Sequence, residues 1–293
     1  MTTVSSQPAA IAALPRPRKN VRQRVSGGPE RGQWLRFALL AAITAVVLIP
    51  VFVTVVLAFL PTTGGTTPTL QNFVDVLSTS LVGQWMSNSL QVTFVTVIVS
   101  VAVAAPAGYV LSRGRNRLVS GYSLLLFVIQ SLPVITAVIP LYILFANVGL
   151  VDSLLGLSIV YVGTTMSVAT WMMAAYFDSI PASLEEAAWI DGCSVFGGFM
   201  RIVLRNSLPG ILSTAIFAFL IAWNDYLIAI VFLKSDSVFT LPLGLQSFFQ
   251  QNTTDWGSVM AVSVLMMLPP IIIFAFLNRF FSVGGIGGSL AGR

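Results

Sequence analysis

The chain lacks histidine altogether and contains a single cysteine, Cys193. Histidine is the commonest general base of enzymes and, together with cysteine, the usual ligand of zinc, so sites of both kinds are excluded. One cysteine permits no intrachain disulfide. Charge is scarce too, since 9% of the residues are charged, 56% are apolar and the mean hydropathy is +0.90. Soluble domains carry about a quarter charged residues, so the composition indicates a membrane protein.

Lysine is also rare, since the chain has only Lys19 and Lys234. Neither lies in a G-x-x-x-x-G-K-[ST] loop, with which many ATPases hold the phosphates of ATP. No nucleophile, base and orienting group occur together either. The sequence therefore predicts a non-catalytic chain that holds no metal and no cofactor.

Long charge-free stretches predict six membrane-spanning helices, because about 20 apolar residues cross the hydrocarbon core. The stretches are centred near residues 48, 99, 133, 165, 222 and 269. The expected fold class is therefore an all-α membrane protein with six transmembrane helices. Prolines inside the spans, such as Pro133 and Pro140, predict either ordinary kinks or a bundle that bends around a pathway.

Basic residues are distributed unevenly along this pattern. With the N-terminus inside, the cytoplasmic segments carry 14 of the 15 basic residues, and only Lys234 lies outside. Short cytoplasmic loops hold the excess of Lys and Arg, so both termini are predicted to be cytoplasmic. The net charge of +5 then reflects topology in a lipid membrane, and no nucleic-acid partner is expected.

Composition divides the chain into three parts. Residues 1–36 are rich in Pro, Ser and Arg and are predicted to form a disordered, basic cytoplasmic tail. Residues 37–281 form the predicted six-helix domain, which includes a cytoplasmic loop at 178–208, and residues 282–293 form a Gly-rich cytoplasmic tail. The first apolar run is too long for a typical signal-peptide core, so this span is expected to be retained.

The stretch 178–205 concentrates charge between two apolar runs. Ser183 and Glu186 have the S-x-x-E spacing of a capping box, and Gly192 is suited to end a helix in the left-handed conformation. This pattern predicts a helix of about two turns from Leu184 to Asp191. A helix this short is not stable alone in water, so it needs a surface on which to dock.

The predicted helix has two kinds of side chain to offer a partner. A small, smooth face at i, i+3 and i+4 is formed by Leu184, Ala187 and Ala188. Charge is offered by Glu185, Glu186 and Asp191. A plain interfacial loop, in which Glu186 only caps the helix, is the other interpretation that these residues allow.

Glu186-Ala187-Ala188 is followed after three residues by Gly192 and, nine residues later, by Ile202-x-Leu204. This spacing resembles the EAA motif of permease subunits in binding-protein-dependent ABC importers. Further segments resemble the carbohydrate-uptake branch, and are similar to the second membrane subunit of the maltose and glycerol-phosphate transporters: Ala222-Trp223-Asn224-Asp225-Tyr226, Leu241-Pro242-Leu243-Gly244-Leu245 and Asp255-Trp256-Gly257. The chain departs from the family at Arg205, where a proline usually stands, and in a C-terminal tail without lysine.

The resemblance implies a type I ABC importer permease fold and a set of partners. These would be a second permease subunit, a cytoplasmic ATPase dimer and an extracytoplasmic solute-binding protein. ATP and Mg²⁺ would be bound by the ATPase, which would dock on the loop through Leu184, Glu185, Glu186, Ala187, Ala188, Asp191 and Gly192. The implied function is uptake of a sugar or related polar solute; a non-sugar solute, or a self-sufficient channel or carrier, is the alternative.

Asp225 is the one ionisable residue expected well inside a span. A carboxylate there is costly, so it is a candidate functional site by default. Trp223, Asn224 and Tyr226 would surround it with the stacking and hydrogen-bonding groups that bind sugars. The sequence thus predicts that Trp223 to Tyr226 line a translocation pathway, and a buried polar contact from Asp225 to a neighbouring helix is the alternative.

Overall fold

The computed structural model describes residues 32–62, 65–249 and 254–285. These residues form helices joined by turns and contain no strand, although Phe249 and Thr254 form an isolated β-bridge. The chain divides into two compact units, residues 1–49 and 50–293. Most of the two predicted tails lies outside the described residues.

The first helix, α1 (Gln33–Ala58), begins four residues before the predicted boundary at residue 37. The charge of Arg36 predicts a place outside the membrane, but a long basic side chain at a helix end reaches the polar interface while its backbone stays helical. The most apolar stretch of α1 has no buried residue. A helix that is apolar all round is suited to cross a membrane.

Four helices are long and apolar enough to cross a membrane: α1, α3 (Val82–Arg113), α6 (Leu154–Asp178) and α13 (Trp256–Gly285). Two bent pairs bring the number to six if each is one span: α4 (Arg117–Ser131) with α5 (Val134–Asn147), and Val195–Asn206 with α10 (Leu208–Asn224). The shorter elements are α2 (Gln71–Thr79), α11 (Leu227–Phe232), η2 (Asp236–Val238), α12 (Leu241–Leu245) and η3 (Gln246–Phe248). The helical class is confirmed, whereas the six-span count and the orientation of the termini remain predictions.

The third predicted span is not one straight helix, because α4 and α5 meet at 96°. Leu132 takes an extended conformation (ψ 126°) and Pro133 follows it as the N-cap of α5. A residue before proline avoids the helical region, so the break falls where the sequence places Pro133. Pro140, by contrast, lies inside α5. The predicted bend is thus confirmed at the first of the two prolines.

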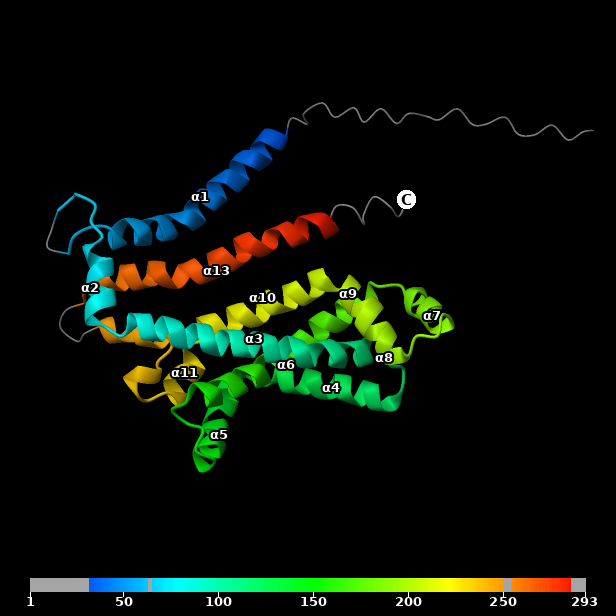
Figure 1. The fold of residues 1–293 in the computed structure, drawn as a ribbon. Helices are drawn as coiled ribbons and strands as arrows, with labels where there is room; N and C mark the ends of the chain where they lie inside the picture. Colours follow the sequence, from blue (N-terminus) through cyan, green and yellow to red (C-terminus); the bar gives the residue numbers. More distant parts are fainter. Residues whose placement is uncertain (1–31, 63–64, 250–253, 286–293) are drawn as a thin grey trace, which may run out of the picture. The chain divides into compact units, whose positions relative to one another are not determined.

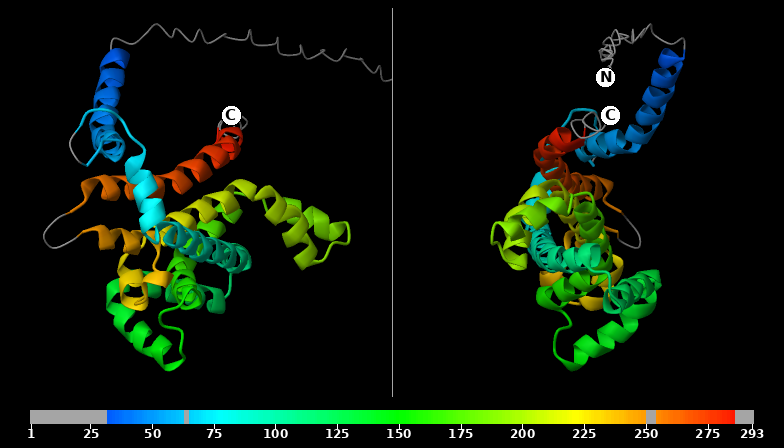
Figure 2. Two further views of the ribbon diagram at one scale, coloured as in Figure 1. Left: turned by 60° about the vertical axis from the view of Figure 1, so that its left-hand side comes forward. Right: turned by 90° about the vertical axis from the view of Figure 1, so that its right-hand side faces the viewer.

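The helices α3 and α6 lie side by side along much of their length (Figures 1 and 2). Small residues make this approach possible: a Cβ added at Gly108 would lie 2.8 Å from the Cβ of Met173 and 2.9 Å from the backbone nitrogen of Ala174. Ser100 and Thr165 add a buried hydrogen bond between their hydroxyls at 2.8 Å. Small residues and interhelical hydroxyl contacts stabilise helix pairs in membranes, so α3 and α6 form the central packed pair.

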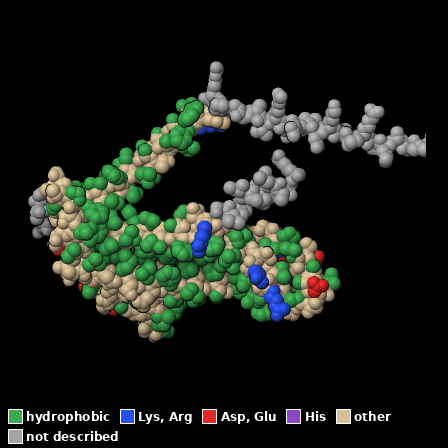
Figure 3. Space-filling view, turned by 45° about the horizontal axis from the view of Figure 1, so that its top comes forward, with side chains coloured by type: hydrophobic (Ala, Val, Ile, Leu, Met, Phe, Trp, Pro, Cys, Tyr) green, Lys and Arg blue, Asp and Glu red, His purple; other side chains and the backbone are tan. Residues whose placement is uncertain are grey.

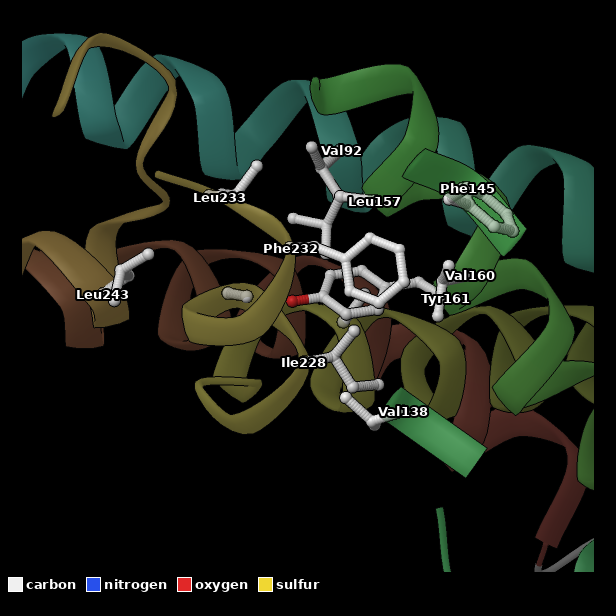
Figure 4. Close-up of a cluster of buried hydrophobic side chains, with 12 residues drawn as sticks. Val92, Val138, Phe145, Leu157, Val160, Tyr161, Ile228, Phe232, Leu233 and Leu243 are labelled. Atoms are coloured by element: carbon white, nitrogen blue, oxygen red, sulfur yellow. The ribbon is translucent and has the colours of Figure 1, made fainter. Parts of the chain in front are cut away.

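A cluster of buried side chains joins α5, α6 and α11 to α3 (Figure 4). Tyr161 and Phe232 are each 1% exposed. Phe232 also contacts Phe145 edge-on, with ring centroids 5.5 Å apart. This packing holds the short helix α11 against the side of α6.

Asp152 links the turn before α6 to the residues after α11. Its Oδ1 accepts hydrogen bonds from the backbone nitrogens of Lys234 (2.8 Å) and Ser235 (2.9 Å), and its Oδ2 accepts one from the Ser235 hydroxyl. These bonds, chiefly that from the hydroxyl, hold the pKa of Asp152 below its usual range. Their stabilisation is therefore present above the unfolded-state pKa of about 3.9 and is lost as the pH falls through the lower folded-state pKa.

Candidate functional site

The polar loop folds into a short helix followed by a helical return to the bundle. Helix α7 covers Ser183–Ile190, and the return consists of α8 (Val195–Gly198), a π-helical turn (Phe199–Val203) and α9 (Leu204–Asn206). The loop lies beyond the C-terminal end of α3, at one end of the bundle (Figure 1). In Figure 3, Lys and Arg side chains (blue) and Asp and Glu side chains (red) lie at and beside this end, and hydrophobic side chains (green) are spread over the whole face drawn.

The start of α7 differs from the predicted capping box. Ala182 is the N-cap, with helical φ and ψ of −60° and −26°, and no side chain caps the helix. The carbonyl of Ala182 accepts hydrogen bonds from the backbone nitrogens of Glu185 and Glu186. Because the turn begins at Pro181, Ser183 is already helical and cannot adopt the extended conformation that capping requires. The capping box is therefore wrong, although the helix matches its predicted bounds within one residue.

The end of α7 follows the prediction. Gly192 has a φ of +86°, which places it in the left-handed region. Its nitrogen donates to the Trp189 carbonyl at 3.0 Å, and the nitrogen of Cys193 donates to the Ala188 carbonyl at 2.9 Å. This arrangement satisfies carbonyls that would otherwise be left without donors at the helix end. Ser194 then caps α8 by accepting a bond from the nitrogen of Gly197 at 3.1 Å.

Glu185 does not offer its charge to a partner, contrary to the prediction. Its side chain is 2% exposed and pairs with Arg113 of α3, with 2.7 Å between the glutamate Oε1 and the arginine Nη2. A buried carboxylate needs such a partner because desolvation disfavours an unpaired charge. This pairing was not predictable from local sequence, because Arg113 lies 72 residues away.

The outward side of α7 carries the remaining candidate docking residues. Glu186, Leu184, Ala187, Asp191 and Gly192 are exposed, and Ala188 is half-buried. Neither Glu186 nor Asp191 has an ion-pair partner among the described residues. Large apolar side chains are exposed around them: Leu184, Trp189, Ile190, Val195 and Phe196. An exposed patch that mixes apolar and acidic groups is typical of a contact with another protein.

The departure at Arg205 leaves the loop intact. Arg205 is exposed in α9, and the next proline, Pro209, stands four residues later in the first turn of α10. Proline is favoured at this position since its missing N–H would have had no helical partner. The 75° bend between the return segment and α10 falls just before it, at Ser207.

Trp223 is a core residue and is not available to a solute in this arrangement. Its side chain is buried, its indole nitrogen donates to the Met266 carbonyl at 3.1 Å, and its ring stacks on Phe219 with centroids 5.6 Å apart. The predicted stacking of a sugar on Trp223 is therefore wrong for this arrangement. Asn224 is exposed and Tyr226 is half-buried, and their place in a pathway stays a prediction.

Asp225 lies at a break in the predicted fifth span, and not inside a helix. Helix α10 ends at Asn224, and Asp225 is extended, with a ψ of 132°. Its Oδ1 accepts hydrogen bonds from the Tyr161 hydroxyl of α6 (2.8 Å) and from the backbone nitrogens of Ile228 (3.0 Å) and Ala229 (3.2 Å). The carboxylate thus caps α11 and fastens it to α6. This is the polar contact to a neighbouring helix that the sequence left open.

Replacing Asp225 by alanine should destabilise the detergent-solubilised chain by about 1–3 kcal/mol, because the donors it serves lose their acceptor. Asp225→Asn retains an Oδ1 acceptor and should unfold close to the wild-type temperature. Thermal unfolding of the two variants checks this difference. Equal destabilisation by alanine and asparagine would contradict it.

A cavity of about 640 Å³ lies beside the bend between α4 and α5. Most of its lining is apolar, and the polar side chains among its lining residues are Gln130, Thr164 and Ser167. The sequence signalled this region only through Pro133, which is itself part of the lining.

The family described as "Binding-protein-dependent transport system inner membrane component" matches residues 104–283. The chain belongs to this family. The permease is 34% identical over 226 residues to the inner membrane ABC transporter permease protein YcjP of Escherichia coli, covering 76% of this chain and 81% of the relative. It is 32% identical over 230 residues to the maltodextrin transport system permease protein MdxG of Bacillus subtilis, covering 76% and 81%.

The fold of the permease is also similar to that of a solved importer. The crystal structure of a bacterial ABC transporter involved in the import of the acidic polysaccharide alginate matches it with a TM-score of 0.73 at 20% identity, over 85% of this chain and 95% of the other. The permease thus has the expected type I fold and is a multi-pass inner-membrane subunit of an ABC importer. Such subunits are transport components, and they work together with other subunits of the importer.

Proposed function

We propose that this permease forms half of the translocation pathway for a sugar or a related polar solute. Carbohydrate transport recurs among its relatives, and this recurrence carries the proposal. Besides the maltodextrin permease, the diacetylchitobiose uptake system permease protein DasC of Streptomyces coelicolor is 30% identical over 224 residues. The sulfoquinovosyl glycerol transport system permease protein SmoH of Agrobacterium fabrum is 28% identical over 225 residues.

The proposed assembly contains a second permease subunit, a cytoplasmic ATPase dimer that binds ATP and Mg²⁺, and an extracytoplasmic solute-binding protein. The ATPase docks on the outward side of α7, through Glu186 and the exposed apolar side chains beside it. Support comes from the exposure of this short helix, whose outward carboxylates lack ion-pair partners among the described residues. The open cavity beside the α4–α5 bend is suited to the pathway side of the subunit, since ligand sites are concave and mostly apolar with a few polar groups.

Uptake of a panel of radiolabelled solutes tests the substrate class. Host cells without the gene for this permease should lose ATP-dependent uptake of a mono- or oligosaccharide and keep uptake of amino acids and peptides. Restoring the wild-type chain should restore the sugar uptake. Normal uptake of every sugar, together with loss of a non-sugar solute, would contradict the sugar assignment. Transport by the purified chain alone in liposomes without ATP would contradict the importer itself.

A further inference from the structure

The two adjacent glutamates of α7 face opposite ways. Glu186 is exposed, whereas both carboxylate oxygens of Glu185 are engaged by α3. Oε1 accepts from the Arg113 Nε at 2.8 Å, and Oε2 accepts from the Tyr109 hydroxyl at 2.6 Å. We call Tyr109, Arg113 and Glu185 the Glu185 network. It ties α7 directly to the last turns of α3.

The same network also fixes the short connection between α6 and α7. Arg113 Nη2 donates to the carbonyl of Ile180 at 2.9 Å, inside this connection. The neighbouring Ser112 hydroxyl donates to the carboxylate of Asp178, the last residue of α6, at 2.5 Å. The end of α3 therefore holds the chain before α7 as well as α7 itself.

Aromatic packing completes the junction. The ring of Tyr109 lies 4.7 Å from that of Phe199 in the π-helical turn and 6.2 Å from that of Phe177 in α6. Phe177 and Phe199 belong to one buried cluster with Met173 and Val203. Segments on both sides of α7 thus pack around one tyrosine, whose hydroxyl bonds to α7.

We propose that the Glu185 network makes α7 and α3 move as one body when the ATPase displaces α7. The inference rests on the proposed docking of the ATPase. Moving α7 away from α3 would leave the buried carboxylate of Glu185 without its partners, which is far more costly than losing an exposed ion pair. Because α3 is packed closely along α6 at Gly108, the displacement passes to the central helix pair. Glu185, Arg113 and Tyr109 are therefore positioning residues for transport, while Glu186 serves docking.

Distance measurement between two spin labels tests this inference directly. Cysteines replace the exposed residues Ser183 on α7 and Gln91 on α3 in a Cys193→Ser background, and the labelled permease is purified with its ATPase. Gln91 is about 33 Å along α3 from Arg113, so the pair spans the junction. The distance is measured without nucleotide and in the complex trapped with ATP and vanadate. It should be the same in both states.

Two matched variants separate transmission from docking. Glu185→Gln should retain the ATPase but broaden or shift the distance distribution on trapping, whereas Glu186→Gln should leave the distance unchanged in the complex that still forms. A wild-type distance that changes on trapping, in a complex that retains the ATPase, overturns the inference alone. Absence of the ATPase from the wild-type preparation overturns the proposed docking and this inference with it. The wild-type comparison decides the matter even if Glu185→Gln does not fold.

Discussion

Permease carrying Glu186→Arg is expected to insert into the membrane but to lose its ATPase. The side chain is exposed on α7 and makes no ion pair with another described residue, so its replacement should leave the fold unchanged. A surface of the ATPase that is complementary to the Glu186 carboxylate would repel an arginine at this position, and such a juxtaposition of like charges costs several kcal/mol. A cost of about 3 kcal/mol lowers the affinity more than a hundredfold. The amount of ATPase that co-purifies with tagged permease measures the effect.

The matched control is Asp236→Arg, another reversal of an exposed carboxylate. Asp236 lies at the opposite end of α3, where its backbone carbonyl accepts a hydrogen bond from the Trp85 indole at 2.7 Å. This variant should retain the ATPase in full. If Glu186→Arg retains it equally well, Glu186 is not part of the docking surface.

A leucine at Gly108 is expected to unfold much of the solubilised permease. A Cβ at this position would lie 2.9 Å from the backbone nitrogen of Ala174 and 3.0 Å from the carbonyl oxygen of Thr170. Backbone atoms cannot rotate away as a flexible side chain can, so α3 and α6 must separate. Overpacking costs about 1–3 kcal/mol and sometimes more, and the larger side chain and the central position of this pair place Gly108→Leu at the upper end. Size-exclusion chromatography after a heating series measures the loss.

Gly121 provides the control within the same protein. A Cβ at Gly121 in α4 would meet no atom within 4 Å. Gly121→Leu should therefore be as stable as wild type or slightly more stable, because leucine is the better helix former. Similar losses for the two variants would mean that the close α3–α6 contact does not determine stability.

Features that depend on nearby residues were predictable from the sequence. Charge-free runs located the long helices, because crossing a hydrocarbon layer requires about 20 apolar residues. Pro133 marked the bend between α4 and α5, and Gly192 marked the end of α7. In each case the physical cause lies within a few residues of its effect.

Features that depend on distant partners were not predictable. Glu185 and Glu186 are chemically identical neighbours, and only Glu185 is buried, where it meets Arg113 and Tyr109 on another helix. The same holds for Asp225, whose partner Tyr161 is 64 residues away. No glycine or proline adjoins Asp225 to signal the end of α10. The direction of a side chain at a helix junction depends on residues that are distant in the sequence, so no local sequence pattern predicts it.

Photo-crosslinking from α7 in native membranes tests the central claim most directly. A photoreactive amino acid replaces Ala187, which is exposed beside Glu186, and a control replaces Gln71 in α2, near the other end of α3. Irradiation should give an adduct at Ala187 that contains a P-loop ATPase, identified by mass spectrometry, and no such adduct at Gln71. An ATPase adduct absent from Ala187, or equally strong at Gln71, would contradict the account that ATP drives this permease through α7.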